Sequence, residues 1–134
     1  IEISADASLG ENWQLGAAYT RLRARENRIE EVRRPRHSGQ IRLSRNFADD
    51  RGRASIQFLH NGRRSDSEFI YATPETRVDL QPYTLTNIGV SYELQPNLIL
   101  TVRAENLTGT EYQQVFGYSS PGRCVSLGVK LNLD

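Results

Sequence analysis

The chain has 134 residues, of which 37% are hydrophobic and 25% are charged, and its formal net charge is +1. These values fit one folded domain and exclude a transmembrane helix, because no window approaches about 18 uninterrupted apolar residues. Opposite charges are interspersed, so nothing in the composition predicts a nucleic-acid partner. The low mean hydropathy still fits a β-barrel that is polar on one face and apolar on the other.

Apolar and polar residues alternate with a period of two from one end of the chain to the other, which is typical of β-strands. In the first run, for example, Ile3 and Ala5 alternate with Ser4 and Asp6. The runs are separated by connections that are alternately short and long. The pattern predicts seven strands, at 1–9, 13–24, 37–47, 53–62, 82–94, 98–107 and 124–134.

The alternation of short and long connections distinguishes between two kinds of β structure. Outer-membrane barrels have short periplasmic turns and long extracellular loops, and each strand crosses the apolar layer with roughly nine to eleven residues. A soluble barrel would instead pack the apolar side inward, and the sequence alone does not say which side is inward. The loop asymmetry favours the membrane. The polar side of the runs carries the charged residues Glu2, Asp6, Arg42, Arg103, Glu105 and Lys130.

The odd number of strands leads to an expectation about the whole protein. Bacterial outer-membrane barrels close with an even number of strands and have both termini on the periplasmic side. Counted back from a periplasmic C-terminus, the first of seven strands would begin at the extracellular end. We therefore expect residues 1–134 to be the C-terminal part of a larger barrel.

The segment VRAENLTGTEYQQVFGYSSPGRCVSLGVKL, residues 102–131, resembles the C-terminal end of TonB-dependent outer-membrane receptors. The closest similarity is to the cobalamin-receptor branch. Upstream, RRPRHSGQIRLS and LQPYTLTNIGVSYEL look like segments of the same family in the same order. Two departures are Asn106-Leu107-Thr108-Gly109, where the family often has Asn-Leu-Phe-Asp, and Asp134, where such barrels usually end in an aromatic residue.

The resemblance implies an all-β fold, an antiparallel up-and-down transmembrane β-barrel segment contributing about seven strands to a 22-stranded barrel. It implies active import of a metal chelate, cobalamin or a siderophore, across the bacterial outer membrane and in contact with its lipid. Energy would come from the TonB complex through an N-terminal region that this chain does not include, and the plug domain is likewise absent from it. The family is not enzymatic and the resemblance implies no cofactor.

Seven residues are candidates for contact with the chelate, and each also has a structural interpretation. The two charged residues before Asn106 could form a charge pair on the lumen side, and the aromatic residues could pack the last connection against the barrel rim. The arginines could belong to a solvated loop. The candidates are Arg33, Arg34, Arg103, Glu105, Tyr112, Phe116 and Tyr118.

Other kinds of site are not predicted. His37 and His60 lack metal-ligand spacing, and no catalytic arrangement surrounds the single cysteine, Cys124. Two alternatives to import stay open, namely a soluble all-β ligand-binding module and an outer-membrane barrel with a structural or adhesive role. Seven strands leave two open edges, so we expect the isolated segment to self-associate.

Overall fold

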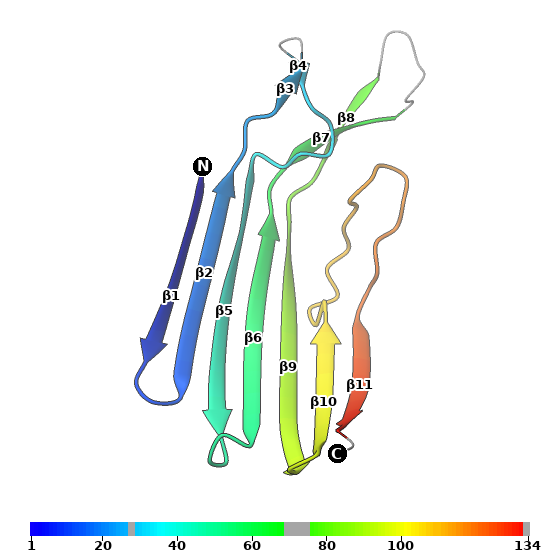
Figure 1. Cartoon of the computed structure of the whole chain (residues 1–134). Helices are drawn as coiled ribbons and strands as arrows, with labels where there is room; N and C mark the ends of the chain where they lie inside the picture. The colour runs from blue at the N-terminus through cyan, green and yellow to red at the C-terminus, as the bar shows by residue number, and fades with distance from the viewer. Residues whose placement is uncertain (27–28, 69–75, 133–134) are drawn as a thin grey trace.

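The computed structural model describes residues 1–26, 29–68 and 76–132, and these contain no helix long and apolar enough to cross a membrane. Seven strands form one antiparallel sheet in the order β1-β2-β5-β6-β9-β10-β11, and two short hairpins, β3-β4 and β7-β8, stand beyond one end of it (Figure 1). In chain order the strands are β1 (Glu2–Leu9), β2 (Trp13–Arg21), β3 (Arg25–Glu26), β4 (Ile29–Glu30), β5 (His37–Phe47), β6 (Gly52–Asn61), β7 (Arg64–Ser67), β8 (Arg77–Leu80), β9 (Tyr83–Gln95), β10 (Leu98–Glu105) and β11 (Cys124–Leu131).

All seven predicted strands are confirmed, and each pairs with its neighbour along the chain. Four of them end earlier than predicted. β6 ends at Asn61, one residue early, and β11 ends at Leu131, before Asn132. β2 ends at Arg21, and β10 ends at Glu105 because Asn106 has a positive φ of 48° and turns the chain out of the sheet. The hairpins β3-β4 and β7-β8 were not predicted, since their short polar sequences carry no alternation. The last two residues of the final predicted strand lie outside the described residues.

The two ends of the sheet differ. We call the end with the long connections 22–36, 62–82 and 106–123 the loop end, and the opposite end the turn end. The N-terminus lies at the loop end and the C-terminus at the turn end (Figure 1). This arrangement is the one expected for a segment of barrel wall, in which short turns and long loops occupy opposite sides.

The strand register gathers the apolar residues on one side of the sheet. Ala17 of β2 pairs with Ala5 of β1 and with Ile41 of β5, and Ile41 pairs in turn with Phe58 of β6. Further along the sheet, Val102 pairs with Val90 and Leu127. We call this side the apolar face. Its large side chains are exposed, among them Ile3, Ile41, Phe58, Val90, Val102 and Leu127.

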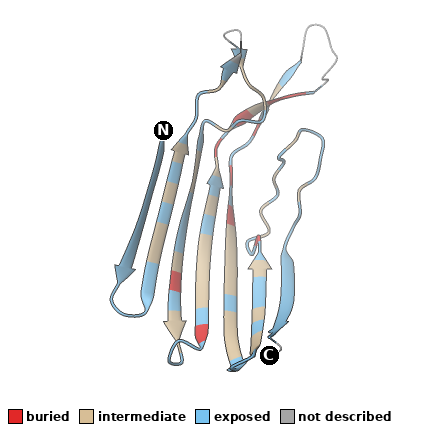
Figure 2. Cartoon of the chain, in the orientation of Figure 1, coloured by how far each residue is buried: buried red, intermediate tan, exposed pale blue. Residues whose placement is uncertain are grey.

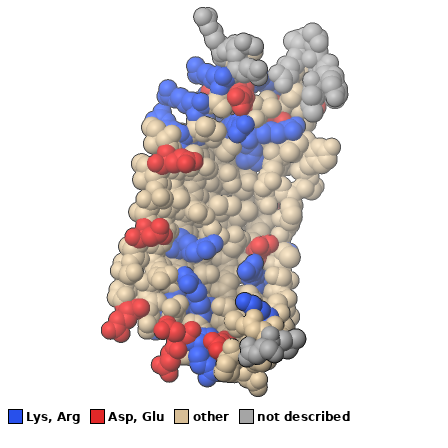
Figure 3. All heavy atoms as spheres, viewed as in Figure 1, with Lys and Arg blue, Asp and Glu red and all other residues tan. Residues whose placement is uncertain are grey.

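The opposite side, the polar face, carries hydroxyl, amide and charged side chains. In one row across the strands, Gly16 pairs with Asp6 and Arg42, and Arg42 pairs with Gln57. Arg53 donates hydrogen bonds to Gln14 Oε1 at 2.9 Å and to Ser44 Oγ at 3.0 Å. Arginine and acidic side chains are scattered over the sheet in the view of Figure 3. Charged side chains are stable on this face because it is in contact with water.

Buried residues gather at the loop end and not in the middle of the sheet (Figure 2). Glycines apart, seven of the eight buried residues in the described part of the chain lie there, and the eighth is Ser44 within β5; of the two buried glycines, Gly62 lies at the loop end and Gly52 at the turn end. The sheet itself has one layer, so its faces are uncovered except near the loop end. The set at the loop end comprises Arg64, Asp66, Ser67, Leu80, Tyr83, Leu85 and Asn106.

Candidate ligand pocket at the loop end

A pocket of about 940 Å³ opens at the loop end, between the segment that leads into β9 and the connection from β10 to β11. The segment 79–83 forms one wall and the connection forms the other. Aromatic rings, charged side chains and small hydroxyl residues share the lining. The lining includes Tyr83, Glu111, Tyr112, Phe116 and Arg123.

Beneath this pocket the polar face carries apolar and aromatic side chains. Tyr83 pairs with Asn61 and Leu85 pairs with Leu59, so both project on the polar face near the loop end of β9. Tyr83 is 6% exposed and Leu85 is 9% exposed. The connection from β10 to β11 therefore folds back over the polar face, and apolar residues occur on that face where the connection covers them.

Tyr83 is the centre of an aromatic cluster. Its ring lies 4.3 Å from that of Tyr112, and the guanidinium of Arg64 lies over it at 5.3 Å. Arg64 also donates a hydrogen bond to the carbonyl of Gln113. Stacking and cation–π contacts of this kind each contribute about 0.5–1.5 kcal/mol. The cluster fixes the wall of the pocket that carries Tyr112.

Asp66 of β7 fixes the loop end at a second place. Its carboxylate is fully buried and accepts hydrogen bonds from Arg33 Nε at 2.8 Å, from the backbone N–H of Ser67 at 2.8 Å and from that of Phe116 at 2.7 Å. Burial alone would raise the pKa of Asp66, but the two backbone donors and Arg33 outweigh it and lower the pKa below its usual value. One carboxylate thus joins all three long connections.

Asn106 organises the start of the last connection. Its side-chain amide donates to the carbonyl of Thr110 at 2.9 Å and accepts from the N–H of Thr110 at 2.9 Å, while its own N–H donates to Asn87 Oδ1 at 3.0 Å. Gly109 has a φ of +68°, and a Cβ there would lie 2.7 Å from Nε of Arg123. Asn106, Gly109 and Arg123 thus hold together the two ends of the last connection, and we call this part of the connection the loop base.

Replacing Asn106 by alanine should destabilise this loop base by about 2–4 kcal/mol, because two hydrogen bonds are lost and alanine disfavours a positive φ. Amide exchange at Thr110 in the refolded full-length protein measures the loss. Asn106→Gly is the matched control, since it loses the same bonds without the backbone penalty and should cost about 1 kcal/mol less. Equal exchange in wild type and Asn106→Ala would show that the loop base does not depend on this side chain.

The seven residues predicted from the sequence are only partly brought together. Tyr112 and Phe116 line the pocket. Tyr118 is 72% exposed and lies outside the lining. Arg103 and Glu105 are exposed on the polar face of β10, and the described residues contain no ion pair between them.

The two predicted arginines of the first long connection differ. Arg33 bonds the buried carboxylate of Asp66, so it is part of the framework that supports the pocket. Arg34 makes an exposed ion pair with Glu31 at 3.1 Å. A role of either in ligand contact stays a prediction.

Sequence reasoning missed Arg64, Asp66 and Tyr83. Arg64 and Asp66 lie in a polar stretch, RRSDSE, that has no apolar alternation. Tyr83 stood at the start of a predicted strand, but nothing in its neighbours indicated that it would be buried. The described residues contain no group of three or more His, Cys, Asp or Glu that could hold a metal ion.

Comparison with solved structures finds the same fold in parts of outer-membrane receptors. The ferripyoverdine receptor of the outer membrane of Pseudomonas aeruginosa, bound to ferripyoverdine, matches 97% of the chain with a TM-score of 0.77 and 18% identity. FpvA bound to heterologous pyoverdines gives 0.78 and 18%, and the FpvAI–pyocin S2 complex gives 0.79 and 16%. The chain has the fold of an outer-membrane receptor wall.

The match covers 18–19% of the length of those receptors, so the chain spans about a fifth of them. A search against protein-family models found no match. The antiparallel sheet and its structural matches confirm the expectation of an all-β, antiparallel fold. The strand number of the complete barrel and the cobalamin branch stay predictions.

Proposed function

We propose that this chain is the C-terminal wall segment of a TonB-dependent outer-membrane transporter that imports a metal chelate. The observation that carries the proposal is the common fold over 97% of the chain with a receptor of the outer membrane that binds ferripyoverdine. The plug domain and the segment that contacts TonB would belong to parts of the protein outside residues 1–134.

The two faces of the sheet support a place in the membrane. Exposed Ile, Leu, Val and Phe side chains cover the apolar face, and the charged side chains of the polar face would line a water-filled interior. In water, an uncovered apolar face of this extent is unfavourable. Lipid on one side and an aqueous lumen on the other satisfy both faces. The open edges of β1 and β11 would pair with further strands of the same barrel.

The pocket at the loop end supports a role in chelate capture. It lies on the polar side of the wall, and its rings, carboxylate and guanidinium offer stacking, hydrogen bonding and charge to a ligand of mixed polarity. A siderophore such as a pyoverdine has these properties, and so does cobalamin. The similarity to ferripyoverdine receptors favours a siderophore, whereas the sequence resemblance favours cobalamin.

Uptake by cells that express the full-length protein tests the proposal. Radio-iron supplied as a ferric siderophore and radiolabelled cobalamin are offered separately, with and without functional TonB. We expect TonB-dependent accumulation of one of them. The double variant Tyr112→Ala with Phe116→Ala should weaken binding of that ligand by about 10-fold or more, because two rings are removed from the pocket wall.

Tyr118→Ala is the matched control, because Tyr118 belongs to the same connection but is exposed outside the pocket. It should bind the ligand like the wild type. Accumulation of neither chelate, in cells where the protein is folded in the outer membrane, would contradict the import proposal and favour a structural or adhesive role. A folded product that needs no detergent would instead favour the soluble module.

A further inference from the structure

The apolar face is hollowed near the loop end, over β1, β2, β5 and β6, by a groove of about 410 Å³. The hollow arises because small residues meet there. Ala5 pairs with Ala17, and Gly39 pairs with Tyr19. Larger apolar side chains rise on either side of them and stay exposed. Ala5, Ala17 and Gly39 form the floor of the groove. Its walls are formed chiefly by Ile3, Ile41 and Phe58.

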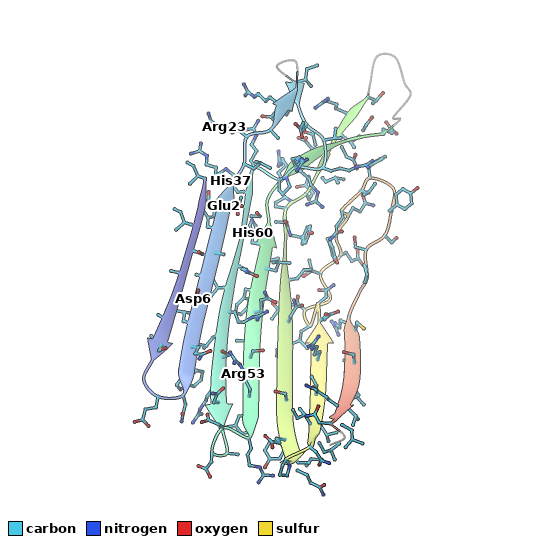
Figure 4. All side chains as sticks on the ribbon, viewed as in Figure 1. Glu2, Asp6, Arg23, His37, Arg53 and His60 are labelled. Carbon is cyan, nitrogen blue, oxygen red and sulfur yellow. The ribbon has the colours of Figure 1, made fainter. Side chains whose placement is uncertain are left out.

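Polarity rises in steps from this groove towards the loop end. Above Ile41 and Phe58 comes a hydrogen-bonding level, where Tyr19 Oη lies 2.6 Å from His37 Nδ1 and His60 Nδ1 lies 2.9 Å from Thr84 Oγ1. His37 and His60 are labelled in Figure 4, at the loop end of β5 and β6. Aromatic and imidazole groups with an apolar body and a polar tip suit the depth at which lipid chains meet headgroups.

From the level of His37 outward the face is basic. Arg21 pairs with His37 in the register and lies on the same face as Tyr19, two residues further towards the loop end. Arg23 follows on the segment between β2 and β3 (Figure 4). Both arginines are exposed, and neither makes an ion pair or a side-chain hydrogen bond within the described part of the chain.

Among the described side chains, the neighbouring acids Glu2 and Glu30 do not neutralise this pair. Glu2 pairs with Thr20 and so projects on the polar face, on the other side of the sheet. Glu30 is bonded to Arg36 and lies 3.9 Å from Arg25. Within the described residues, the guanidinium groups of Arg21 and Arg23 therefore lie without a side-chain partner between the apolar groove and the loop end, at the side of the wall that the proposed function makes extracellular.

We propose that the groove binds one phosphorylated glycolipid of the outer leaflet, with an acyl chain along Ala5, Ala17 and Gly39 and a phosphate on Arg21 and Arg23. The order of levels along the strands, apolar and then hydrogen-bonding and then cationic, matches the order of chain, sugar and phosphate in such a lipid. Arginine is suited to phosphate because its planar donors bind two oxygens at once. The inference rests on the outer-membrane location of the proposed function and is independent of transport.

Native mass spectrometry on the full-length protein in neutral detergent tests it, with bisphosphorylated lipid A as the probe and the dephosphorylated form, with the same acyl chains, as the neutral comparison. We expect one tightly bound lipid A. Arg21→Gln and Arg23→Gln should each weaken lipid A binding about fivefold and leave the neutral form unaffected. Ala17→Leu fills the groove and should weaken both forms about 10-fold or more.

Two matched controls lie elsewhere on the sheet. Arg42→Gln removes an arginine from the polar face, and Ala104→Leu enlarges a small residue on the apolar face outside the groove. Neither should change lipid binding. If Ala17→Leu lowers the refolding yield, Ala5→Leu replaces it. Equal affinity of wild type and groove variants, or equal binding of both lipid forms by the wild type, would overturn the proposal, and intact chelate uptake would not rescue it.

Discussion

Replacing Asp66 by alanine should release the last long connection from the loop end and lower the free energy of opening that connection by about 3 kcal/mol. The buried carboxylate accepts from Arg33, Ser67 and Phe116, and its loss leaves all three donors without their partner. Hydrogen bonds to a charged group contribute about 1.5–3 kcal/mol each, and Arg33 is partly exposed, so water recovers part of the loss.

Hydrogen exchange at the Phe116 and Ser67 amides of the full-length protein measures the effect. Asp66→Asn keeps one carbonyl acceptor and should lose less protection than Asp66→Ala. Asp79→Ala is the matched control, because Asp79 is an exposed acid of the adjoining strand and lies 3.9 Å from Arg63. It should leave both amides protected. Unchanged exchange in Asp66→Ala would show that the three connections hold together without this carboxylate.

The pH dependence of the same protection has a definite sign. The pKa of Asp66 is lower in the folded protein than in an open loop, because two backbone N–H groups and Arg33 outweigh the effect of burial. Its stabilisation is therefore fully present above the ordinary Asp pKa of about 3.9, and it is lost as the pH falls through the lowered value. Protection of Phe116 should stay constant near neutral pH and fall only in acid.

The strands of the sheet were predictable because each one leaves its own local signature. The alternation in the seven strands is a property of neighbouring residues, and the short turns that join β1 to β2, β5 to β6 and β9 to β10 leave little freedom in the register of those pairs. The loop base was partly predictable for a similar reason. Asn106 and Gly109 are residue types that tolerate a positive φ, and both have one.

The pocket was not predictable in this way, because contacts between distant parts of the chain create it. Asp66 joins Arg33 and Phe116, which are 33 and 50 residues away in the sequence. Tyr83 is buried because Tyr112 and Arg64, which are distant in the sequence, pack against its ring. A polar loop such as RRSDSE does not reveal which of its acids will be enclosed. Tyr112 and Phe116 were found only because aromatic residues are unusual in a polar connection.

The most demanding test of the membrane arrangement uses two neighbouring residues of β10. Val102 is 43% exposed on the apolar face, where it pairs with Val90 and Leu127, whereas Thr101 pairs with Ser91 and Gly128 on the polar face. Val102→Arg should destabilise the full-length protein in bilayers by about 2–4 kcal/mol, because it places a charge in the middle of the lipid-facing surface. Thr101→Arg should cost little, because its side chain reaches water. Urea unfolding in lipid vesicles measures both.

Destabilisation by Val102→Arg would also occur if the apolar face were packed inside a soluble protein, so a second measurement separates the two structures. Cys124, an exposed free cysteine, is first replaced by serine, and a nitroxide spin label is attached at Val102→Cys or Thr101→Cys. In a barrel wall, the label at 102 meets oxygen dissolved in lipid and the label at 101 meets a water-soluble nickel relaxant. In a soluble module the label at 102 would be shielded from both, and that result would contradict the proposed place of the sheet in the membrane.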